Sequence, residues 1–463
     1  MGFDYSGKRV MILGMARSGV AAAKLLASRG ALVRVNDMKT EAQLGEILEP
    51  IRGVENIEWR LGEKAEALLE GMDALVISPG VPIESPVVQK ARALGVEVIG
   101  EIELSARFNR GRLVAITGTN GKTTTTTLTG EIFKASGAKT YVVGNIGYPF
   151  AAVAGETAED DVVVCEVSSF QLESVAGFRP AVACVTNIRE DHLNRHHTMA
   201  CYAAMKKRIF EAQMAEDTLV LFYDDPMLRE AAREAKSHVI WFSATQTPPE
   251  GAFVKDGMIV FGKAGDCEAV CRADELKIPG RHNLENALAA VAAAMAAGVK
   301  AEAAARALRA FGGVEHRMEF VRELDGVRYI DDTEGTNADS TVRAVQAMTS
   351  PTVIILGGSD KKNDYTELCR TIVKSGFIAH AVLIGQTARQ FEETLLREGY
   401  PARRIHHAAR DFRGAIELSR ALAEKGGAVL LSPACASFDM FHNCEERGDI
   451  FKDIVKGMVS RQA

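Results

Sequence analysis

The interpretation of this chain begins at one stretch, Ile116-Thr117-Gly118-Thr119-Asn120-Gly121-Lys122-Thr123-Thr124. Apolar residues precede it and a segment with helical spacing follows, so it is predicted to join a buried strand to a helix. Strand, glycine-containing loop and helix are together the setting of a phosphate-binding loop. Gly118 and Gly121 let the backbone approach a phosphate, and the start of the helix offers free N–H groups. Lys122 can reach the outer phosphates, and the Thr123 hydroxyl can hold Mg²⁺.

The stretch differs from the general NTPase loop at one position. The pattern G-x-x-x-x-G-K-[ST] requires glycine at position 116, where this chain has isoleucine. An ordinary strand-to-helix turn with a surface lysine is the alternative, but position, glycines, lysine and threonine all agree with phosphate binding. We therefore interpret the stretch as a shortened phosphate loop, which a generic NTPase assignment does not fit.

Length and composition exclude several classes of protein. A chain of 463 residues is too long for one core, so two or three domains are expected. The net charge of -6 gives no electrostatic footprint for nucleic acid. No apolar run is long enough to span a bilayer, and Met1 to Lys8 lacks the pattern of a secretory signal. We expect a cytoplasmic monomer without nucleic-acid or membrane partners.

The eight cysteines lack regular spacing, which is typical of reduced cytosolic thiols. Cys267 and Cys271 are close in sequence, but no second pair of ligands follows them. A zinc site there is not favoured, and we expect both to be exposed thiols in a loop.

Residues 1–100 are predicted to form a first α/β domain. An apolar strand ends before Gly14, and a second strand ends at Asp37. This is similar to a dinucleotide fingerprint, but Ala16 replaces its second glycine, and a plain strand–helix–strand turn explains it equally well. A third strand runs into the loop Ser78–Pro82, at the sheet edge where open α/β sheets bind ligands. We expect this domain to hold a nucleotide-like group other than the hydrolysed one.

The second predicted domain, residues 101–313, contains a strand that ends in a carboxylate. The run from Asp161 is apolar up to Glu166, as in the middle of a parallel sheet. Glu166 would then lie at the carboxyl edge beside the phosphate loop. A solvated acid is the alternative, but residues 167–173 begin a helix with good capping chemistry, and we favour Glu166 as a Mg²⁺ ligand.

Three more features of this domain remain open from the residues alone. His192 falls just past the strand 181–186, where a metal or catalytic role is favoured over a structural one. Lys206 lies on a basic helical face, which is normally solvated surface, so composition cannot single it out. Asn283 and Asn286 share one face of an alanine-rich helix that runs to about residue 297, where they could contact a purine or cap the helix.

The third predicted domain, residues 314–463, follows a predicted hinge at Phe311-Gly312-Gly313. Arg317 comes soon after, and a permanently charged guanidinium suits a phosphate across a cleft. Polar or charged residues follow four predicted strands, at 327–330, 353–356, 381–384 and 429–431. This is the expected ligand edge of a second doubly wound sheet.

Together these motifs resemble the Mur ligase family, which builds the peptide of bacterial cell-wall precursors. The resemblance covers nearly the whole chain and rests on four segments, residues 118–124, 166–172, 187–193 and 432–439. It implies three α/β domains, each on a mostly parallel sheet: Rossmann-like at the N-terminus, a phosphate-loop ATP domain in the centre, and Rossmann-like at the C-terminus. It also implies ATP-dependent amide-bond formation through an acyl phosphate. The segment 432–439 points to the D-glutamate-adding branch, with UDP-N-acetylmuramoyl-L-alanine and D-glutamate as substrates.

The resemblance also implies roles for individual residues. Lys122, Glu166, His192 and Lys206 would be catalytic. Lys206 would be carbamoylated and, with Thr123, Glu166 and His192, would serve two Mg²⁺ ions. The residues implied to bind ATP are Gly118, Thr119, Asn120, Gly121, Lys122, Thr123, Thr124, Asn283, Asn286, Arg317 and Asp332. Those implied to bind the other substrates are Gly14, Ser18, Asp37, Ser78 and Gly80 for the sugar nucleotide, Asn145 and Ser168 near the phosphates and metal, and Thr336, Lys361 and Ser437 for D-glutamate.

The chain departs from the family pattern at two positions. Glu334 replaces a lysine and would repel an acidic substrate unless it points away, and Cys444 replaces an aromatic residue. The alternatives are another ligase of the superfamily, a kinase or nucleotide switch, and a dinucleotide oxidoreductase. The last rests only on the incomplete Gly14 motif, and a kinase would leave the ligand edge of the third domain unexplained.

Overall fold

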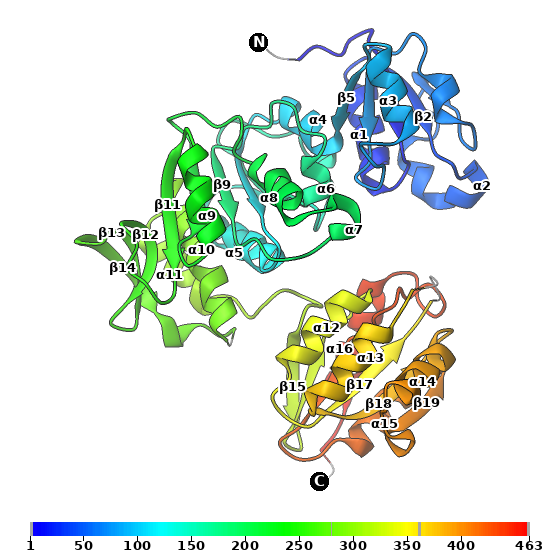
Figure 1. Ribbon diagram of the computed structural model, residues 1–463, viewed down its shortest axis with the longest axis vertical. Coiled ribbons are helices and arrows are strands. Elements are labelled where there is room, and N and C mark those ends of the chain that lie inside the picture. The colour runs from blue at the N-terminus through cyan, green and yellow to red at the C-terminus, as the bar shows by residue number, and fades with distance from the viewer. Residues whose placement is uncertain (1–2, 279, 360–362, 461–463) are drawn as a thin grey trace. The chain divides into compact units, whose positions relative to one another are not determined.

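The computed structural model describes residues 3–278, 280–359 and 363–460. The chain divides into two compact parts, Met1–Phe311 and Gly312–Ala463 (Figure 1). The first part contains two sheets and the second contains one. None of the helices in the described part of the chain combines the length and hydropathy needed to span a bilayer.

The N-terminal sheet has five parallel strands in the order β3-β2-β1-β4-β5. Their bounds are β1 Arg9–Leu13, β2 Leu32–Asn36, β3 Ile57–Trp59, β4 Ala74–Ile77 and β5 Glu97–Gly100. The helical segments are α1 Arg17–Ser28, α2 Glu41–Leu44, η1 Gly45–Ile51, η2 Ala65–Leu68, α3 Pro86–Ala93 and α4 Glu101–Phe108. The central position of β1, between β2 and β4, places the loop after Leu13 at the carboxyl edge of the sheet.

The second sheet has nine strands in the order β14-β13-β12-β11-β10-β9-β6-β8-β7. The parallel strands are β6 Arg112–Thr117, β7 Thr140–Gly144, β8 Val162–Glu166, β9 Val182–Val185, β10 Thr218–Phe222, β11 His238–Ser243 and β12 Glu250–Lys255; β13 Met258–Lys263 and β14 Asp266–Arg272 continue antiparallel. The helical segments are α5 Lys122–Ala135, η3 Phe150–Ala152, α6 Ser169–Leu172, α7 Leu193–His196, α8 Met199–Lys207, α9 Pro226–Ala231, η4 Ala232–Glu234, η5 Ala273–Glu275, α10 Arg281–Ala296 and α11 Ala301–Ala310. In the register of β6, Ile116 pairs with Glu166 and Thr117 with Val185, so three strand ends meet at one edge.

The antiparallel strands overturn one expectation. Cys267 and Cys271 lie on β14 and not in a loop, and Cys271 is buried. The prediction of exposed loop thiols was wrong because residues 266–272 pair with β13 as a strand, and α11 packs against that strand. All eight cysteines are free thiols.

The third sheet has six strands in the order β15-β16-β20-β17-β18-β19, with β15 antiparallel at one edge. The strands are β15 Glu319–Leu324, β16 Val327–Asp331, β17 Thr352–Gly357, β18 Ile378–Ile384, β19 Ile405–Ala409 and β20 Ala428–Leu431. The helical segments are α12 Ala338–Ala347, α13 Thr366–Ser375, α14 Ala388–Arg397, η6 Ala402–Arg404, α15 Phe412–Leu422 and α16 Cys444–Gly457.

Helices cover both faces of this third sheet (Figure 1). Ile354 and Leu356 of β17 pack with α12, α13 and α14, whereas Val353 and Ile355 pack with α15 and α16. Alternate residues of one strand therefore enter opposite core layers, which explains why these strands are continuously apolar. The predicted fold class, three mostly parallel α/β sheets, is confirmed.

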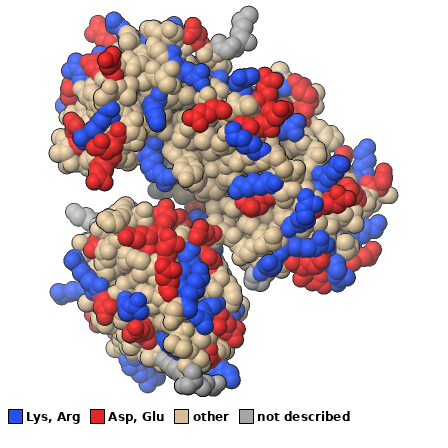
Figure 2. Space-filling model, turned by 180° about the vertical axis from the view of Figure 1, so that it is seen from behind, with Lys and Arg blue, Asp and Glu red and all other residues tan. Residues whose placement is uncertain are grey.

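The surface carries both signs of charge. Basic and acidic side chains are intermingled over the face shown in Figure 2. This mixture agrees with the totals of 55 Lys and Arg against 61 Asp and Glu.

Glu101, at the start of α4, ties the N-terminal and central sheets together and predicts a pH-dependent stability. It is 3% exposed, and its Oε1 accepts from the Ala151 N–H at 2.6 Å and the Ser105 hydroxyl at 3.1 Å. Burial raises its pKa to about 7. The folded state therefore binds its proton more tightly than the unfolded state, and stability should be lost as pH rises from the ordinary value toward 7.

The test is chemical denaturation of the wild type and Glu101→Gln across this pH range. The stability of the wild type relative to Glu101→Gln should fall by up to about 1.4 kcal/mol per pH unit between about pH 5 and 7. The exposed Glu131→Gln on α5 is the control and should follow the wild type. A pH-independent difference between wild type and Glu101→Gln would contradict the prediction.

Candidate active site

The loop between β6 and α5 requires its two glycines. Gly118 and Gly121 have φ of 149° and 79°, in the region that side chains disfavour. A methyl group at Gly118 would lie 1.8 Å from Thr186 Oγ1, and one at Gly121 would lie 2.1 Å from Asn286 Oδ1. Both positions thus combine positive φ with close packing, as a loop that surrounds a phosphate needs.

The segment after β9 fixes the shape of this loop. The Thr119 N–H donates to the Asn187 carbonyl, and the Asn120 N–H donates to Asn187 Oδ1, both at 2.9 Å. The Thr186 hydroxyl donates to the Asn120 carbonyl at 2.6 Å. These bonds engage the N–H groups of Thr119 and Asn120 and the carbonyl of Asn120. A ligand would therefore bind to the other backbone groups of the loop.

Two lysine amines bond to carbonyls of the loop. Lys122 Nζ donates to the Thr119 carbonyl at 3.0 Å, and Lys206 Nζ donates to the Gly118 carbonyl at 2.6 Å. Lys206 is 1% exposed, and its amine lies 4.6 Å from the centre of the Tyr202 ring. Burial, reinforced by the charge of Lys122, lowers the pKa of Lys206 well below its ordinary value. The usual interpretation as solvated surface is therefore wrong for Lys206, whereas the adjacent Lys207 pairs with Glu234.

Glu166, at the end of β8, is buried, and only one of its two carboxylate oxygens accepts a hydrogen bond from the described residues. It is 1% exposed, and its Oε1 accepts from Asn145 Nδ2 at 2.8 Å. Its Oε2 has no hydrogen-bond partner among the residues that the structure describes. A solvated acid is therefore excluded, and a buried carboxylate oxygen without a donor fits a bound cation. Ser168, two residues on, caps α6 through a bond from the Gln171 N–H.

His192 caps the short helix α7 in a left-handed conformation, with φ of 53°. Its ring lies 4.9 Å from that of Phe170, and its Nε2 lies 3.6 Å from Asp191 Oδ2. Asp191 was assigned no role from sequence, although it belongs to the same segment past a strand end. Its charge acts on the pKa of Lys206, so it belongs to the electrostatics of this site.

Asn286, 8% exposed on α10, faces the phosphate loop. Its Oδ1 is the atom that excludes a side chain at Gly121, and its Nδ2 donates to Asn283 Oδ1 at 3.4 Å. The N-cap of α10 is Gly280 and not either asparagine. Thr123 and Thr124, half-buried in the first turn of α5, complete this side of the site.

The predicted nucleotide residues of the N-terminal sheet also meet at one edge. Gly14 has φ of 95°, and its carbonyl accepts from the Ser78 hydroxyl at 2.9 Å. Asp37 Oδ2 accepts from the Met15 N–H at 2.8 Å, which joins the end of β2 to the same loop. Ser18 is half-buried on α1 and Gly80 is exposed.

In the second compact part, polar residues also lie at the carboxyl ends of the strands. Asp332 is buried, accepts from the Ser432 hydroxyl at 2.6 Å, and has its pKa raised to about 7 by burial. Ser437 is 2% exposed, and its hydroxyl has no partner in the described part of the chain. Thr336 is half-buried and Arg317 is exposed. Lys361 lies outside the described residues.

Sequence reasoning missed Arg447, which is fully buried. Its Nε and Nη2 donate to the hydroxyl and carbonyl of Thr333 at 2.8 and 2.9 Å, and its Nη1 donates to the Cys435 carbonyl at 3.2 Å. This arginine joins α16 to the two segments after β16 and β20. Glu334, beside Thr333, lies 3.8 Å from Cys444 Sγ.

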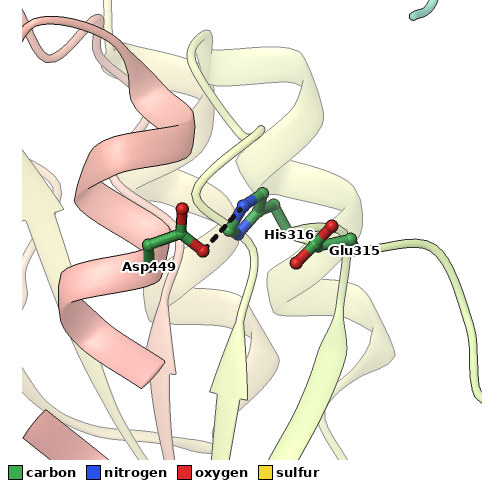
Figure 3. A group of neighbouring side chains, drawn as sticks. All are labelled: Glu315, His316 and Asp449. Carbon is green, nitrogen blue, oxygen red and sulfur yellow. Dashed lines mark ion pairs between the residues drawn. The ribbon is translucent and has the colours of Figure 1, made fainter. Parts of the chain in front are cut away.

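His316, which precedes Arg317, is held by charged neighbours (Figure 3). It is buried, and its Nδ1 lies 2.8 Å from Asp331 Oδ2 while its Nε2 lies 3.6 Å from Asp449. Glu315 and Asp449 form a group that could hold a metal with His316, but Lys452 Nζ lies 2.5 Å from the former and 3.3 Å from the latter. This cluster is therefore an ion-pair network.

A phosphate loop beside a buried carboxylate, in a chain of three α/β sheets, defines an enzyme that handles nucleoside triphosphates. Three family models match consecutive segments: the Mur ligase MurD-like N-terminal domain at residues 8–100, the Mur ligase middle domain at 116–294, and the Mur ligase glutamate ligase domain at 316–435. The chain belongs to the Mur ligase family. It is accordingly an ATP-dependent ligase, since members of this family use ATP and Mg²⁺. The kinase and oxidoreductase alternatives are thereby excluded.

Several curated relatives carry the name UDP-N-acetylmuramoylalanine–D-glutamate ligase, among them the two that follow. The protein from Alkaliphilus metalliredigens is 45% identical over 98% of this chain and 99% of its own length. The protein from Pelotomaculum thermopropionicum is 47% identical over 98% of both chains.

Solved structures agree in fold. The UDP-N-acetylmuramate–alanine ligase of Thermotoga maritima has a TM-score of 0.57 at 18% identity, over 97% of this chain and 99% of its own. MurF from Acinetobacter baumannii has a TM-score of 0.58 at 18% identity, over 96% and 93%.

The packing of Gly121 predicts that Gly121→Ala loses ATP binding. The methyl group would displace Asn286 and strain the loop, so ATP affinity should fall at least about tenfold, or about 1.4 kcal/mol.

Gly137→Ala, at the end of α5, is the matched control because its φ is also positive, at 92°, but nothing lies within 4 Å of the added methyl group. It should lose only stability, by about 1 kcal/mol, and keep its ATP affinity in a calorimetric titration with Mg²⁺. Equal loss of affinity in both variants would refute this.

Proposed function

We propose that this chain joins D-glutamate to UDP-N-acetylmuramoyl-L-alanine, with cleavage of ATP to ADP and phosphate, in the cytoplasmic synthesis of peptidoglycan precursors. The observation that carries the proposal is the extent of similarity to enzymes of that name, 41–47% identity over at least 97% of the chain. The segment Ser432–Asp439, which the sequence associates with D-glutamate, lies within the matched region. The eight free thiols are consistent with a reducing compartment.

The proposed reaction must first make a negatively charged carboxylate reactive toward an amine. A carboxylate is a poor electrophile, so the γ-phosphoryl group of ATP is first transferred to the carboxylate of the L-alanyl group. The acyl phosphate then has a good leaving group, and the amine of D-glutamate attacks its carbonyl carbon as phosphate departs. Catalysis of such a transfer rests on positioning and on neutralising charge.

In the central domain, Lys122 would bind the outer phosphates, and Thr123, Glu166 and His192 would hold Mg²⁺. The unpaired Glu166 Oε2 supports this assignment. When bound, Mg²⁺ supplies neutralisation of phosphate charge and polarisation of the transferred group. Asn283 and Asn286 would contact the adenine, with Asn145 and Ser168 near the phosphates and metal.

Lys206 is proposed to be carbamoylated. Its amine attacks CO₂, and loss of one proton leaves an N-carboxylate anion. The buried, lowered-pKa amine favours this reaction because only the neutral amine is a nucleophile. The product would place an anion beside Lys122, where it could serve a second Mg²⁺ ion.

The three predicted domains would divide the substrates. Residues 1–100 would bind the sugar nucleotide through Gly14, Ser18, Asp37, Ser78 and Gly80, and residues 101–313 would bind ATP. Residues 314–463 would bind D-glutamate through Thr336, Lys361 and Ser437, and would contribute Arg317 and Asp332 to ATP. The proximity of Glu334 to Cys444 supports a Glu334 carboxylate directed toward the start of α16.

The specificity is tested by ADP release with UDP-N-acetylmuramoyl-L-alanine and four acceptors in parallel: D-glutamate, L-glutamate, L-lysine and diaminopimelate. ADP should appear only with D-glutamate and only when both substrates are present. Turnover with another acceptor would assign the chain to a different member of the family.

The carbamate is tested with Lys206→Ala, which should lower kcat at least about 100-fold, a loss of about 2.7 kcal/mol of transition-state stabilisation. Lys207→Ala is the control on the same helix and should keep the wild-type rate. Added acetate or formate should partly restore Lys206→Ala by supplying a carboxylate. Wild-type enzyme with ¹³C-bicarbonate should show a carbamate carbon by NMR, and a near-normal rate in Lys206→Ala would rule the carbamate out.

A further inference from the structure

Helix α7, which His192 precedes, is too short to be stable by itself. Isolated helices need about 12 to 15 residues, and α7 has 4. His192 and His197, on either side, have positive φ of 53° and 65°, which costs free energy for residues other than glycine. The position of α7, and so of His192, must be set by side-chain contacts.

Arg195 supplies a charged contact with the end of α6, beside the buried His196, whose Nε2 lies 3.0 Å from Ser169 Oγ. Its Nε and Nη2 donate to the two carboxylate oxygens of Glu173 at 3.0 and 2.6 Å, in bidentate geometry. The pair is largely buried, with side chains 20% and 7% exposed. Glu173 directly follows α6, which itself follows the strand ending in Glu166. The ion pair therefore fastens the segment of His192 to the segment of Glu166.

The same guanidinium reaches the N-terminal sheet. Arg195 Nη2 also donates to the Val81 carbonyl at 3.2 Å. Val81 belongs to the loop Ser78–Pro82, where its N–H donates to the Ser78 carbonyl at 2.9 Å and its side chain packs against the N-terminal core. Arg195 thus links the loop proposed for the sugar nucleotide to the helix that positions His192.

We infer that Arg195 is a positioning residue that couples binding of the sugar nucleotide to binding of ATP with Mg²⁺. A ligand that fixes the loop Ser78–Pro82 fixes the Val81 carbonyl, which orients the guanidinium and, through it, α7. Coupling between two sites is reciprocal, so each ligand must raise the affinity of the other by the same factor. This inference rests on the proposed function, since it takes this loop as the sugar-nucleotide site and His192 as a metal ligand.

The coupling factor is measured without turnover. β,γ-Methylene-ATP with Mg²⁺ is titrated into the full chain with and without saturating UDP-N-acetylmuramoyl-L-alanine, and the reverse titration checks reciprocity. In the wild type we expect each ligand to tighten the other about 5- to 20-fold. Arg195→Lys keeps the charge but cannot hold the fork to Glu173 and the bond to Val81 together, so its factor should fall to about 1. Circular dichroism checks that the variant is folded.

Arg29→Lys is the matched control. Arg29 Nη2 also donates to a carbonyl across the N-terminal and central sheets, that of Gly155 at 2.7 Å, but it contacts the loop after η3 and not α7. It should keep the wild-type factor. Coupling that persists in Arg195→Lys, that disappears equally in Arg29→Lys, or that is absent from the wild type overturns the inference. Failure of the wild type to bind the sugar nucleotide at all would instead overturn the proposed function.

Discussion

The hydrogen bonds between the phosphate loop and the segment after β9 are the constraint on which the central site depends. Asn187 accepts from the N–H groups of Thr119 and Asn120, so these two amides turn toward the sheet. The loop can then present its remaining backbone to a phosphate only if Gly118 and Gly121 adopt positive φ. The segment after β9 therefore determines which positions of the loop must be glycine. The parallel register of β6 with β8 and β9 brings this segment next to the loop.

Charge is the second constraint on the site. The phosphate loop brings ionisable amines and a carboxylate close together before any ligand binds. Two amines, those of Lys122 and Lys206, bond to carbonyls of the same loop, and the pKa of the buried one is depressed. Beside them, one oxygen of the Glu166 carboxylate has no donor in the part of the chain that the structure describes. A site with a buried amine of lowered pKa and a carboxylate oxygen that lacks a donor among the described residues is arranged for additional charges, which agrees with a family that uses ATP and Mg²⁺.

The sequence predicted those parts of the site that follow from strand ends. Carboxyl ends of parallel strands meet at one edge, so Glu166, His192 and the phosphate loop could be placed together from the pattern of apolar runs. The burial of Lys206 could not be predicted, because Lys207 beside it is chemically equivalent and only the tertiary contact with Gly118 distinguishes them. Arg447 was missed for a related reason, since a charged residue on a terminal helix is normally solvated. The exposed-loop prediction for Cys267 and Cys271 failed because the alternation of an edge strand was not recognised.

The short helix α7 shows how a site can be positioned by its ligands. Long helices such as α5 and α10 bury one face along their length. The four-residue helix α7 is too short for such support, so it takes its position from the contacts of Arg195 and the buried His196 with Glu173 and Ser169. On the proposal that His192 holds Mg²⁺, its position would depend on contacts that reach the N-terminal sheet. The phosphate loop is held separately, by bonds to Asn187 after β9, so a change at the loop Ser78–Pro82 would reach α7 and leave the phosphate loop in place.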